Sequence, residues 1–487
     1  MLATRSSSLA RASLLVTLLA AWAWRLSGLT AQSLWRDEVD SLRFATRPLP
    51  QVLAAFTRPG ENGPLFYLLL RPWLSMAGHS EVALRFPAAW LGLLSILLVA
   101  IWGKKLWGPW GGMLAALLMA VNPYHLWYSQ EARMYTMIMV WVLLALWFWV
   151  QALEEGGLGR WGMWYLFISL SFYTHVLAVL LLPVLGLWLL LVPRWRQRWR
   201  AALGALAALI LPYLPLIGWQ WALLTHADFS TGHTFIPLGQ LLRTLFVVQI
   251  QGILAAPAWF FALPIFLLLA AGLLPYDQDV WSGNKVPTGP LLLMGWLLPA
   301  LLLYLITLIT PLFTDRYLIW VLPALVLLLV WGALKVARQN HFLALTLILI
   351  LAAGQLWQGW QQMTRPIKPE LRAAAAWVKP QRQPQELTLF LMPYIQHTYR
   401  YYDAGEYPWA GAPYANRQPD AAQIPQKLAT MTAGYSGVWL IQSEADFYDQ
   451  QGLIRAWLDR HATLSDDLHL VRADVYHYIF PASSASE

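Results

Sequence analysis

The sequence predicts an all-α polytopic membrane protein of about eleven transmembrane helices, followed by a small extracytoplasmic α/β domain at the C-terminal end. Three observations predict it. Of the 487 residues, 58% are hydrophobic and only 12% are charged, whereas soluble domains average about 45–50% and about 25%. Apolar runs of nearly span length recur along the chain. After residue 365 the composition becomes more polar.

The first apolar run follows Arg5 and Arg11 and resembles a signal peptide. No clear small-residue cleavage site follows it, so we expect an uncleaved first span. The run 161–173 is shorter than the roughly 20 residues that a span needs, so we expect a broken or tilted piece there. The expected spans are 10–29, 82–103, 109–128, 134–152, 161–173, 175–192, 201–222, 257–274, 289–310, 317–335 and 342–360.

Residue usage restricts the possible functions further. The chain has 30 tryptophans, and many flank the apolar runs, as expected for an indole at the level of lipid headgroups. It has no cysteine, which excludes disulfides, cysteine-zinc sites and thiol catalysis. We attribute most of the net charge of +8 to loops that face anionic lipid, and not to nucleic-acid binding.

The basic residues predict the orientation. With a cytoplasmic N-terminus, the inner loops contain most of the clustered Lys and Arg, as the positive-inside rule requires. These residues are Lys104, Lys105, Arg160, Arg194, Arg196, Arg198, Arg200, Lys335 and Arg338. The loop 30–81, the loop 123–133 and the chain after 361 then lie outside.

We expect two domains, a transmembrane domain over 1–364 and an extracytoplasmic α/β domain over 365–487. In the second, Glu370–Val378 reads as a helix, and the short alternating runs Leu387–Met392 and Gly437–Ile441 read as strands. The first outer loop contains Pro64–Leu74, whose apolar residues suit a helix in the membrane interface.

Asp37 and Glu38 follow the first span directly and are the leading candidates for chemistry. One carboxylate could act as a general base, or the pair could hold a divalent cation that binds phosphate. An isolated Asp-Glu pair is more often the charged N-terminus of a solvated helix.

Other ionisable groups are expected at the outer ends of spans. Glu131, Arg133 and Tyr135 begin the span after the second outer loop, and Asp315, Arg316 and Tyr317 stand at the end of another. Ionisable groups at such places are functional candidates. For Arg316 the alternatives are phosphate binding and a local ion pair with Asp315. For His175 a packing role is the more common one.

Taken in order, several short motifs resemble the GT-C superfamily of membrane glycosyltransferases. The branch is the bacterial one related to protein O-mannosyltransferases and to the aminoarabinose and galacturonic acid transferases of lipopolysaccharide. The resemblance covers roughly residues 10–335. The motifs that carry it are Trp35-Arg36-Asp37-Glu38, Asn62-Gly63-Pro64-Leu65-Phe66-Tyr67, Ser80-Glu81-Val82-Ala83-Leu84-Arg85-Phe86-Pro87, Asn122-Pro123, Ser129-Gln130-Glu131-Ala132-Arg133-Met134-Tyr135 and Asp315-Arg316-Tyr317.

The resemblance implies that a sugar moves from a polyprenyl-phosphate donor to a lipid, glycan or protein acceptor on the extracytoplasmic side of the bacterial inner membrane. By position, Asp37 is the base, Glu38 its acidic neighbour and Glu131 the second acidic site. Some relatives have a Lys before Pro-Pro-Leu that meets the donor phosphate. Here Asn62-Gly63 precedes Pro64, so Arg85, Arg133 or Arg316 is expected to bind the phosphate.

Two other classes stay open. A transporter or lipid flippase places ionisable groups at the membrane midplane, often in inverted repeats. A membrane scaffold with an outer sensor domain has no use for the acidic pair. The outer placement of the charged groups favours the transferase.

Overall fold

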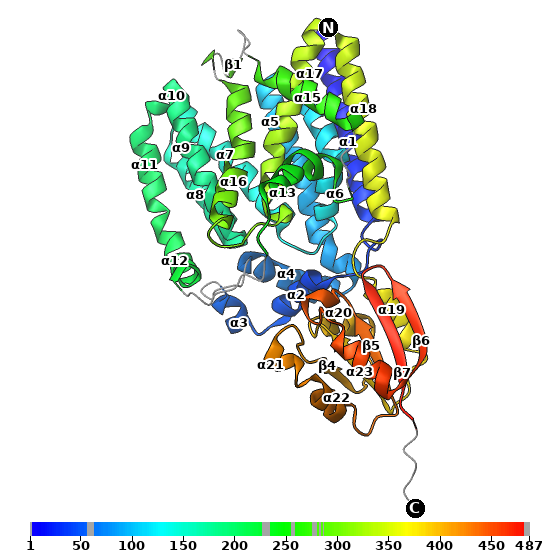
Figure 1. Ribbon diagram of the computed structural model, residues 1–487. Coiled ribbons are helices and arrows are strands. Elements are labelled where there is room, and N and C mark those ends of the chain that lie inside the picture. The colour runs from blue at the N-terminus through cyan, green and yellow to red at the C-terminus, as the bar shows by residue number, and fades with distance from the viewer. Residues whose placement is uncertain are drawn as a thin grey trace, which may run out of the picture. The chain divides into compact units, whose positions relative to one another are not determined.

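The computed structural model describes residues 2–55, 63–225, 234–254, 259–274, 280–281, 284–285 and 287–481. It forms two compact units (Figure 1). The helical unit comprises Met1–Leu29 and Phe44–Gln362, and the small unit comprises Thr30–Arg43 and Met363–Glu487. The segment that contains Asp37 and Glu38 thus belongs to the same compact unit as the C-terminal domain. The second part of that unit begins at Met363, which is 320 residues after Arg43.

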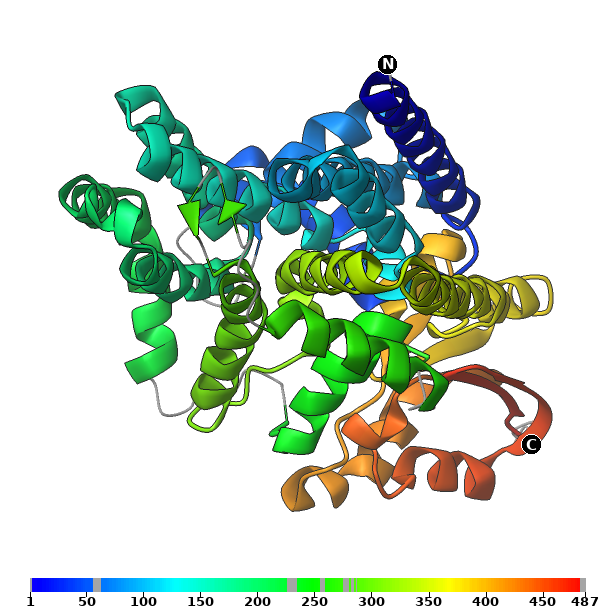
Figure 2. The ribbon, with the colours of Figure 1, turned by 90° about the horizontal axis from the view of Figure 1, so that it is seen from above.

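Apolar helices make up most of the helical unit, and Figure 2 views many of them nearly end-on. Within the described residues, seven helices are long and apolar enough to cross a membrane. The exact number of spans stays a prediction. The long elements are α1 (Leu2–Ser27), α5 (Glu81–Val121), α7 (Tyr135–Glu155), α8 (Leu158–Thr174), α9 (Leu181–Leu191), α11 (Trp199–Ala208), α12 (Ile210–Thr225), α15 (Trp259–Leu273), α16 (Thr288–Thr307), α17 (Leu322–Gln339) and α18 (His341–Thr364).

Helix α5 contains two of the expected spans, which meet at a break. Trp107 and Gly108 have non-helical backbone angles, and Gly108 has φ of 77°, a left-handed conformation that glycine adopts readily. The two halves pack closely through glycines. A Cβ on Gly112 would lie 2.7 Å from the main-chain oxygen of Ala100. The glycines therefore allow the second half to fold back against the first.

The third expected span ends earlier than the run 109–128 predicts. Helix α5 stops at Val121, and α6 (Pro123–Ser129) begins a new direction. Asn122 caps α6, since its side-chain oxygen accepts a hydrogen bond from the His125 N–H at 2.8 Å. Pro123 has no N–H to continue the preceding helix, so hydrophobicity alone overestimates the length of this span.

Three basic loops meet at one end of the helical unit. Glu154 near the end of α7 contacts Lys105 at 3.2 Å and Arg194 of α10 (Pro193–Arg196) at 2.8 Å. In Figure 1, α10 lies at the upper end of this unit and α4 (Pro64–Ala77) at the lower end. The loops that the positive-inside rule groups together therefore do lie on one side of the bundle.

Shorter elements connect the spans of the helical unit. The segment 44–81 contains the end of α2 (Arg36–Thr46), α3 (Leu49–Ala54) and α4. The others are η1 (Val176–Leu180), α13 (Leu238–Arg243), η2 (Thr244–Val248), α14 (Gln249–Gln251), β1 (Val280–Trp281), β2 (Asn284–Lys285) and η3 (Asp315–Val321).

The small unit is built on a five-stranded mixed sheet in the order β4-β3-β5-β7-β6. Strand β3 is parallel to β4 and β5, whereas β7 is antiparallel to both β5 and β6. The strands are β3 (Glu386–Leu391), β4 (Trp409–Gly411), β5 (Gly437–Gln442), β6 (Thr463–Leu470) and β7 (Ala473–Ile479). This sheet confirms the α/β class predicted for the C-terminal domain.

Helices cover both faces of the sheet, which explains why β3 and most of β5 are buried on both faces. One face packs on α19 (Leu371–Val378) and α20 (Ile395–Tyr402). The other packs on α22 (Ile424–Thr432) and α23 (Leu453–His461), and α21 (Gln418–Ala421) is a short turn.

Glu386 is a buried carboxylate at the start of β3. Glu386 accepts hydrogen bonds from the Trp439 indole at 2.7 Å and pairs with His477 at 2.7 Å. Burial raises the pKa of Glu386, but the hydrogen bonds from the Gln383 N–H, Trp439 and His477 outweigh burial and leave the pKa below its usual value.

Candidate functional site

A polar cluster lies where α6 approaches η3 in the helical unit. The Tyr124 hydroxyl donates to the main-chain oxygen of Asp315 at 2.6 Å, and the Tyr128 hydroxyl lies 3.4 Å from its carboxylate. That carboxylate also accepts from the Arg316 N–H at 2.8 Å and from the Thr314 hydroxyl at 3.2 Å. These contacts join two motifs that are almost 200 residues apart.

Cationic and aromatic groups surround His175 in the same unit. The His175 ring lies edge-on to Tyr317, with 4.8 Å between centroids, and the charges of Arg133 and Arg316 both act on it. Arg133 also donates to the Tyr67 hydroxyl of α4 at 3.1 Å. Four segments predicted as separate candidates thus converge in the fold.

His175 has a local structural role as well. It ends α8 and begins η1, and its Nδ1 accepts the Leu177 N–H at 3.3 Å. This explains why the run 161–173 and the run 175–192 are separate helices.

Glu131 and Tyr135 belong to the same neighbourhood. Glu131 is buried and acts electrostatically on Tyr128. The Tyr135 ring packs edge-on against Tyr128, with 5.0 Å between centroids.

A buried network holds α6 in place. Arg25 of α1 and His125 of α6 are fully buried, and Arg25 Nη2 lies 2.8 Å from His125 Nδ1. The other ring nitrogen of His125 lies 2.8 Å from the Ser95 hydroxyl of α5. Because arginine can only donate, Nδ1 accepts, and a neutral His125 donates from Nε2 to Ser95. The network joins three helices and positions the cluster at Asp315.

A polar cavity of about 320 Å³ opens beside Asp315. Such a volume lies at the lower end of the range for small-molecule sites, about 300–1,000 Å³. Arg243 supplies a positive charge to the cavity. The lining residues are Thr234, Ile236, Gln240, Arg243, Thr244, Val248, Phe313, Thr314 and Asp315.

Arg85 and Asn62 are the remaining predicted site residues. Arg85 is buried at the start of α5, where Nη1 donates to the main-chain oxygen of Leu29 at 2.7 Å. It therefore holds the backbone at the end of α1. Asn62 lies outside the described residues.

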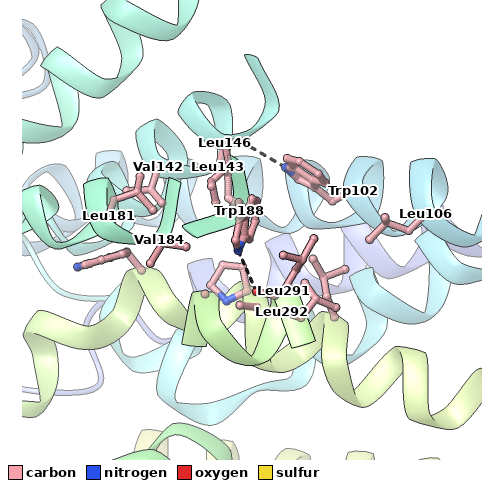
Figure 3. Close-up of a pocket in the computed structure, with 15 residues that line it drawn as sticks. Trp102, Leu106, Val142, Leu143, Leu146, Leu181, Val184, Trp188, Leu291 and Leu292 are labelled. Carbon is pink, nitrogen blue, oxygen red and sulfur yellow. Dashed lines mark hydrogen bonds between the residues drawn. The ribbon is translucent and has the colours of Figure 1, made fainter. Parts of the chain in front are cut away.

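A second cavity is apolar and lies between the spans (Figure 3). Trp102, Trp188 and Trp320 line it with leucines from α7, α9 and α16. The indoles of Trp102 and Trp188 donate to main-chain oxygens of Leu143 and Leu291. Its volume of about 40 Å³ is well below the roughly 300–1,000 Å³ of small-molecule sites, so an isoprenoid chain does not fit without movement of side chains.

The acidic pair stands at the start of α2 in the small unit, where the two carboxylates differ. Glu38 is fully buried, and the Lys368 ammonium lies 2.8 Å from its Oε2. The same oxygen faces the Trp35 N–H at 3.4 Å, so Glu38 also caps its own helix. Asp37 is only half-buried. Glu38 is thus a neutralised structural carboxylate, whereas Asp37 keeps part of its surface accessible.

The backbone around this pair is held by the C-terminal segment. Gln32 accepts from the Ile367 N–H at 2.9 Å, and the Tyr402 hydroxyl accepts the Leu34 N–H at 2.6 Å. Arg372 donates to the main-chain oxygens of Thr30 and Gln32, each at 3.0 Å.

A metal site in the described part of the chain would need several His, Asp or Glu side chains close together. No group of three or more His, Asp or Glu there could hold an ion. At Asp37 and Glu38, the Lys368 ammonium already occupies the position next to the buried carboxylate. The pair therefore does not suit a divalent cation without loss of that ion pair.

Comparison with known proteins shows what this chain is similar to. Residues 59–219 match the family model described as dolichyl-phosphate-mannose-protein mannosyltransferase. Solved structures of GT-C enzymes share the fold across nearly the whole chain. The chain is thus similar in fold to the GT-C membrane glycosyltransferases. No curated protein matches the chain.

The structural relatives are distant in sequence. ArnT from Cupriavidus metallidurans bound to undecaprenyl phosphate is 13% identical, with a TM-score of 0.59 over 97% of this chain and 99% of ArnT. The Archaeoglobus fulgidus oligosaccharyltransferase is also 13% identical, with a TM-score of 0.57 over 97% of this chain and 74% of that protein. The mycobacterial arabinofuranosyltransferase AftD is 15% identical, with a TM-score of 0.52 over 98% of this chain and 42% of AftD.

Sequence reasoning missed four residues of these sites, namely Arg25, His125, Arg243 and Lys368. Arg25 carried a detectable signal, since an ionisable residue inside an apolar run is rarely accidental. The other three stand in segments of ordinary polarity, and only the fold brings them to their partners.

Proposed function

We propose that this chain is a membrane glycosyltransferase. It moves a sugar from a polyprenyl-phosphate donor to a lipid, glycan or protein acceptor on the extracytoplasmic side. The observation that carries the proposal is the convergence of Arg133, Arg316, His175 and Tyr317 in the helical unit. Two structural relatives support the donor class, since ArnT was solved with undecaprenyl phosphate and the archaeal oligosaccharyltransferase with a dolichol-phosphate.

The proposed reaction is a displacement at the anomeric carbon. The acceptor oxygen forms a bond to that carbon while the carbon–oxygen bond to phosphate breaks. The polyprenyl phosphate leaves with the electron pair, and the acceptor proton goes to Asp37. Because a phosphate is a workable leaving group, the protein needs positive charge to stabilise it and a base for the acceptor.

Arg133 and Arg316 are the proposed phosphate ligands, because a planar guanidinium suits phosphate oxygens. Both act on the same imidazole, so their charges reinforce one another at one place. Arg243 in the polar cavity is a third candidate that sequence reasoning did not single out. Glu131 and Tyr135 support the arrangement through Tyr128. Arg85 and Asn62 stay candidates of the resemblance.

Asp37 is the proposed base, and Glu38 is the residue that orients α2. The ion pair of Glu38 with Lys368 supports this division, because a neutralised, fully buried carboxylate is poorly suited to take a proton. We route no step through a divalent cation, and a cation at the acidic pair stays an expectation from the sequence.

The orientation is part of the proposal. The basic loops that meet at Glu154 would lie on the cytoplasmic side of the bacterial inner membrane, and so would the N-terminus. The convergent cluster would then face outward, as would the small unit. The alternative of a transporter or flippase is less well supported, since the matched family model is that of a transferase.

The test of the base is turnover by Asp37→Asn in purified protein with a polyprenyl-phosphate sugar. We expect a loss of about 10²–10⁴-fold, the usual contribution of a general base, with an unchanged melting temperature. The matched control is Asp467→Asn, which removes an exposed carboxylate from β6. Near-normal turnover in Asp37→Asn contradicts the assignment.

The test of the phosphate ligands is Arg316→Ala. We expect a rise in KM for the donor of about tenfold or more, in keeping with a lost charge-assisted hydrogen bond. A lower melting temperature with unchanged KM would show that Arg316 only supports the local structure around Asp315.

A further inference from the structure

Arginines lie over aromatic rings on the face that α2 and α20 share in the small unit. The Arg36 guanidinium lies 4.3 Å from the centroid of the Tyr394 ring, and that of Arg400 lies 4.9 Å from the Trp409 ring. Tyr394 is 52% exposed and Trp409 is 39% exposed. Stacking holds a guanidinium flat while its N–H donors stay directed along its edges. Such an arginine is pre-ordered for a planar or tetrahedral oxyanion.

The two helices contribute charges along their length. Arg36 stacks on Tyr394 at one end, while Arg43 and Arg400 both act electrostatically on His397 further along. Tyr394 and Arg400 are six positions apart, so this face extends over about 9 Å of helix. Figure 1 shows the blue α2 and the orange α20 of this unit.

Positive charge exceeds negative charge on this face. Asp40 contacts Arg43 at 2.9 Å and Arg36 more weakly at 3.8 Å, so one carboxylate serves two arginines. Arg400 adds a third cation. Of the charged residues that α2 and α20 themselves carry, Glu38 is paired with Lys368, which leaves three arginines and the two carboxylates of Asp37 and Asp40. The surplus is suited to an anion that brings its own charge.

We infer that this α2–α20 face binds a sugar-borne oxyanion, a phosphate or a carboxylate, on the acceptor. The inference rests on the proposed function, because it assigns the acceptor to the unit that contains Asp37. Asp37 follows Arg36 in the first turn of α2, so an acceptor held by Arg36 lies within one helical turn of the proposed base. The two exposed rings offer apolar surface to the C–H faces of a sugar.

The test is direct binding to the purified full-length protein, measured by saturation-transfer NMR without any polyprenyl donor. The probes are glucose 6-phosphate, glucuronate, glucose and inorganic phosphate. We expect the two acidic sugars to bind more tightly than glucose or inorganic phosphate, and their relative affinity distinguishes phosphate from carboxylate. Arg36→Gln and Arg400→Gln should each weaken binding about tenfold.

Two further variants separate recognition from folding. Arg400→Lys keeps the charge but loses the planar fork, so its affinity should fall between those of wild type and Arg400→Gln. Arg460→Gln removes an exposed arginine from α23, which packs on β6 at the opposite edge of the sheet from β4, and should bind like wild type.

Several outcomes overturn the inference. One is equal binding of glucose and glucose 6-phosphate, and another is unchanged affinity in both Gln variants. A third is displacement of the sugar phosphate by phosphatidylglycerol in nanodiscs as effectively as by glucuronate, which would make the face a lipid contact. Since no donor is present, these results are independent of the turnover of wild type and of Asp37→Asn, which test the proposed function.

Discussion

The ion pair between Glu38 and Lys368 leads to a prediction about stability. The two side chains are 0% and 6% exposed, and their charged atoms are 2.8 Å apart. At an effective dielectric constant of about 20, two unit charges at that distance attract by about 6 kcal/mol. Loss of hydration offsets much of this attraction. Removal of one partner, however, leaves a buried charge without compensation, which typically costs about 3–5 kcal/mol.

We therefore predict that Lys368→Met and Glu38→Gln each destabilise the protein by about 3–5 kcal/mol, whereas the double variant recovers most of the loss. The assay is denaturant unfolding of the full-length protein in detergent, followed by tryptophan fluorescence, for wild type and the three variants. Lys379→Met is the matched control, because Lys379 is exposed.

The reasoning is refuted if the single variants lose less than about 1 kcal/mol, the range of a surface ion pair. It is also refuted if the two losses simply add in the double variant. If the double variant is stable, its turnover becomes informative, because a purely orienting role for Glu38 predicts activity well above that of Asp37→Asn.

Three other predictions concern pH and packing. Because the folded pKa of Glu386 is lowered, its stabilising contribution is complete above the unfolded value and is lost as pH falls through the folded value. The melting temperature of Glu386→Gln should therefore vary less with pH below about 4.5 than that of wild type, and parallel curves would contradict this. Gly112→Ala should destabilise by about 1–3 kcal/mol, because its Cβ meets a main-chain oxygen at 2.7 Å, whereas Gly162→Ala has open space and should not. Gly295→Ala should stabilise the protein by up to about 1 kcal/mol, because the added Cβ makes ordinary contacts beside the apolar cavity and alanine favours the helix. A lower melting temperature of this variant would argue against that packing.

Much of the fold could be predicted because span formation depends on local composition. Each apolar run of about 20 residues has its own favourable transfer free energy, whatever the rest of the chain does. The break at 174–176 and the α/β character after 365 also appear in local patterns. The end of α5 at Val121 was misjudged, because a proline and its capping asparagine outweigh hydrophobicity there.

The candidate site was predictable as a set of separate motifs. Charged groups at span ends are costly, so Arg133, Arg316 and His175 could be selected from the sequence. Their meeting around Tyr317 could not, because it depends on how α4, α7, η1 and η3 pack. Whether those residues bind the donor stays a prediction.

The sequence by itself determined the apolar, helical character of most of the chain, and it supplied the motifs that resemble a GT-C enzyme. Only the tertiary structure decided what Asp37 and Glu38 have around them. Their segment joins the small unit, and Glu38 finds Lys368, 330 positions away. A contact of that separation has no local signature, because its energy arises only when packing removes water from both charges. That burial distinguishes two adjacent carboxylates that look equivalent in the sequence.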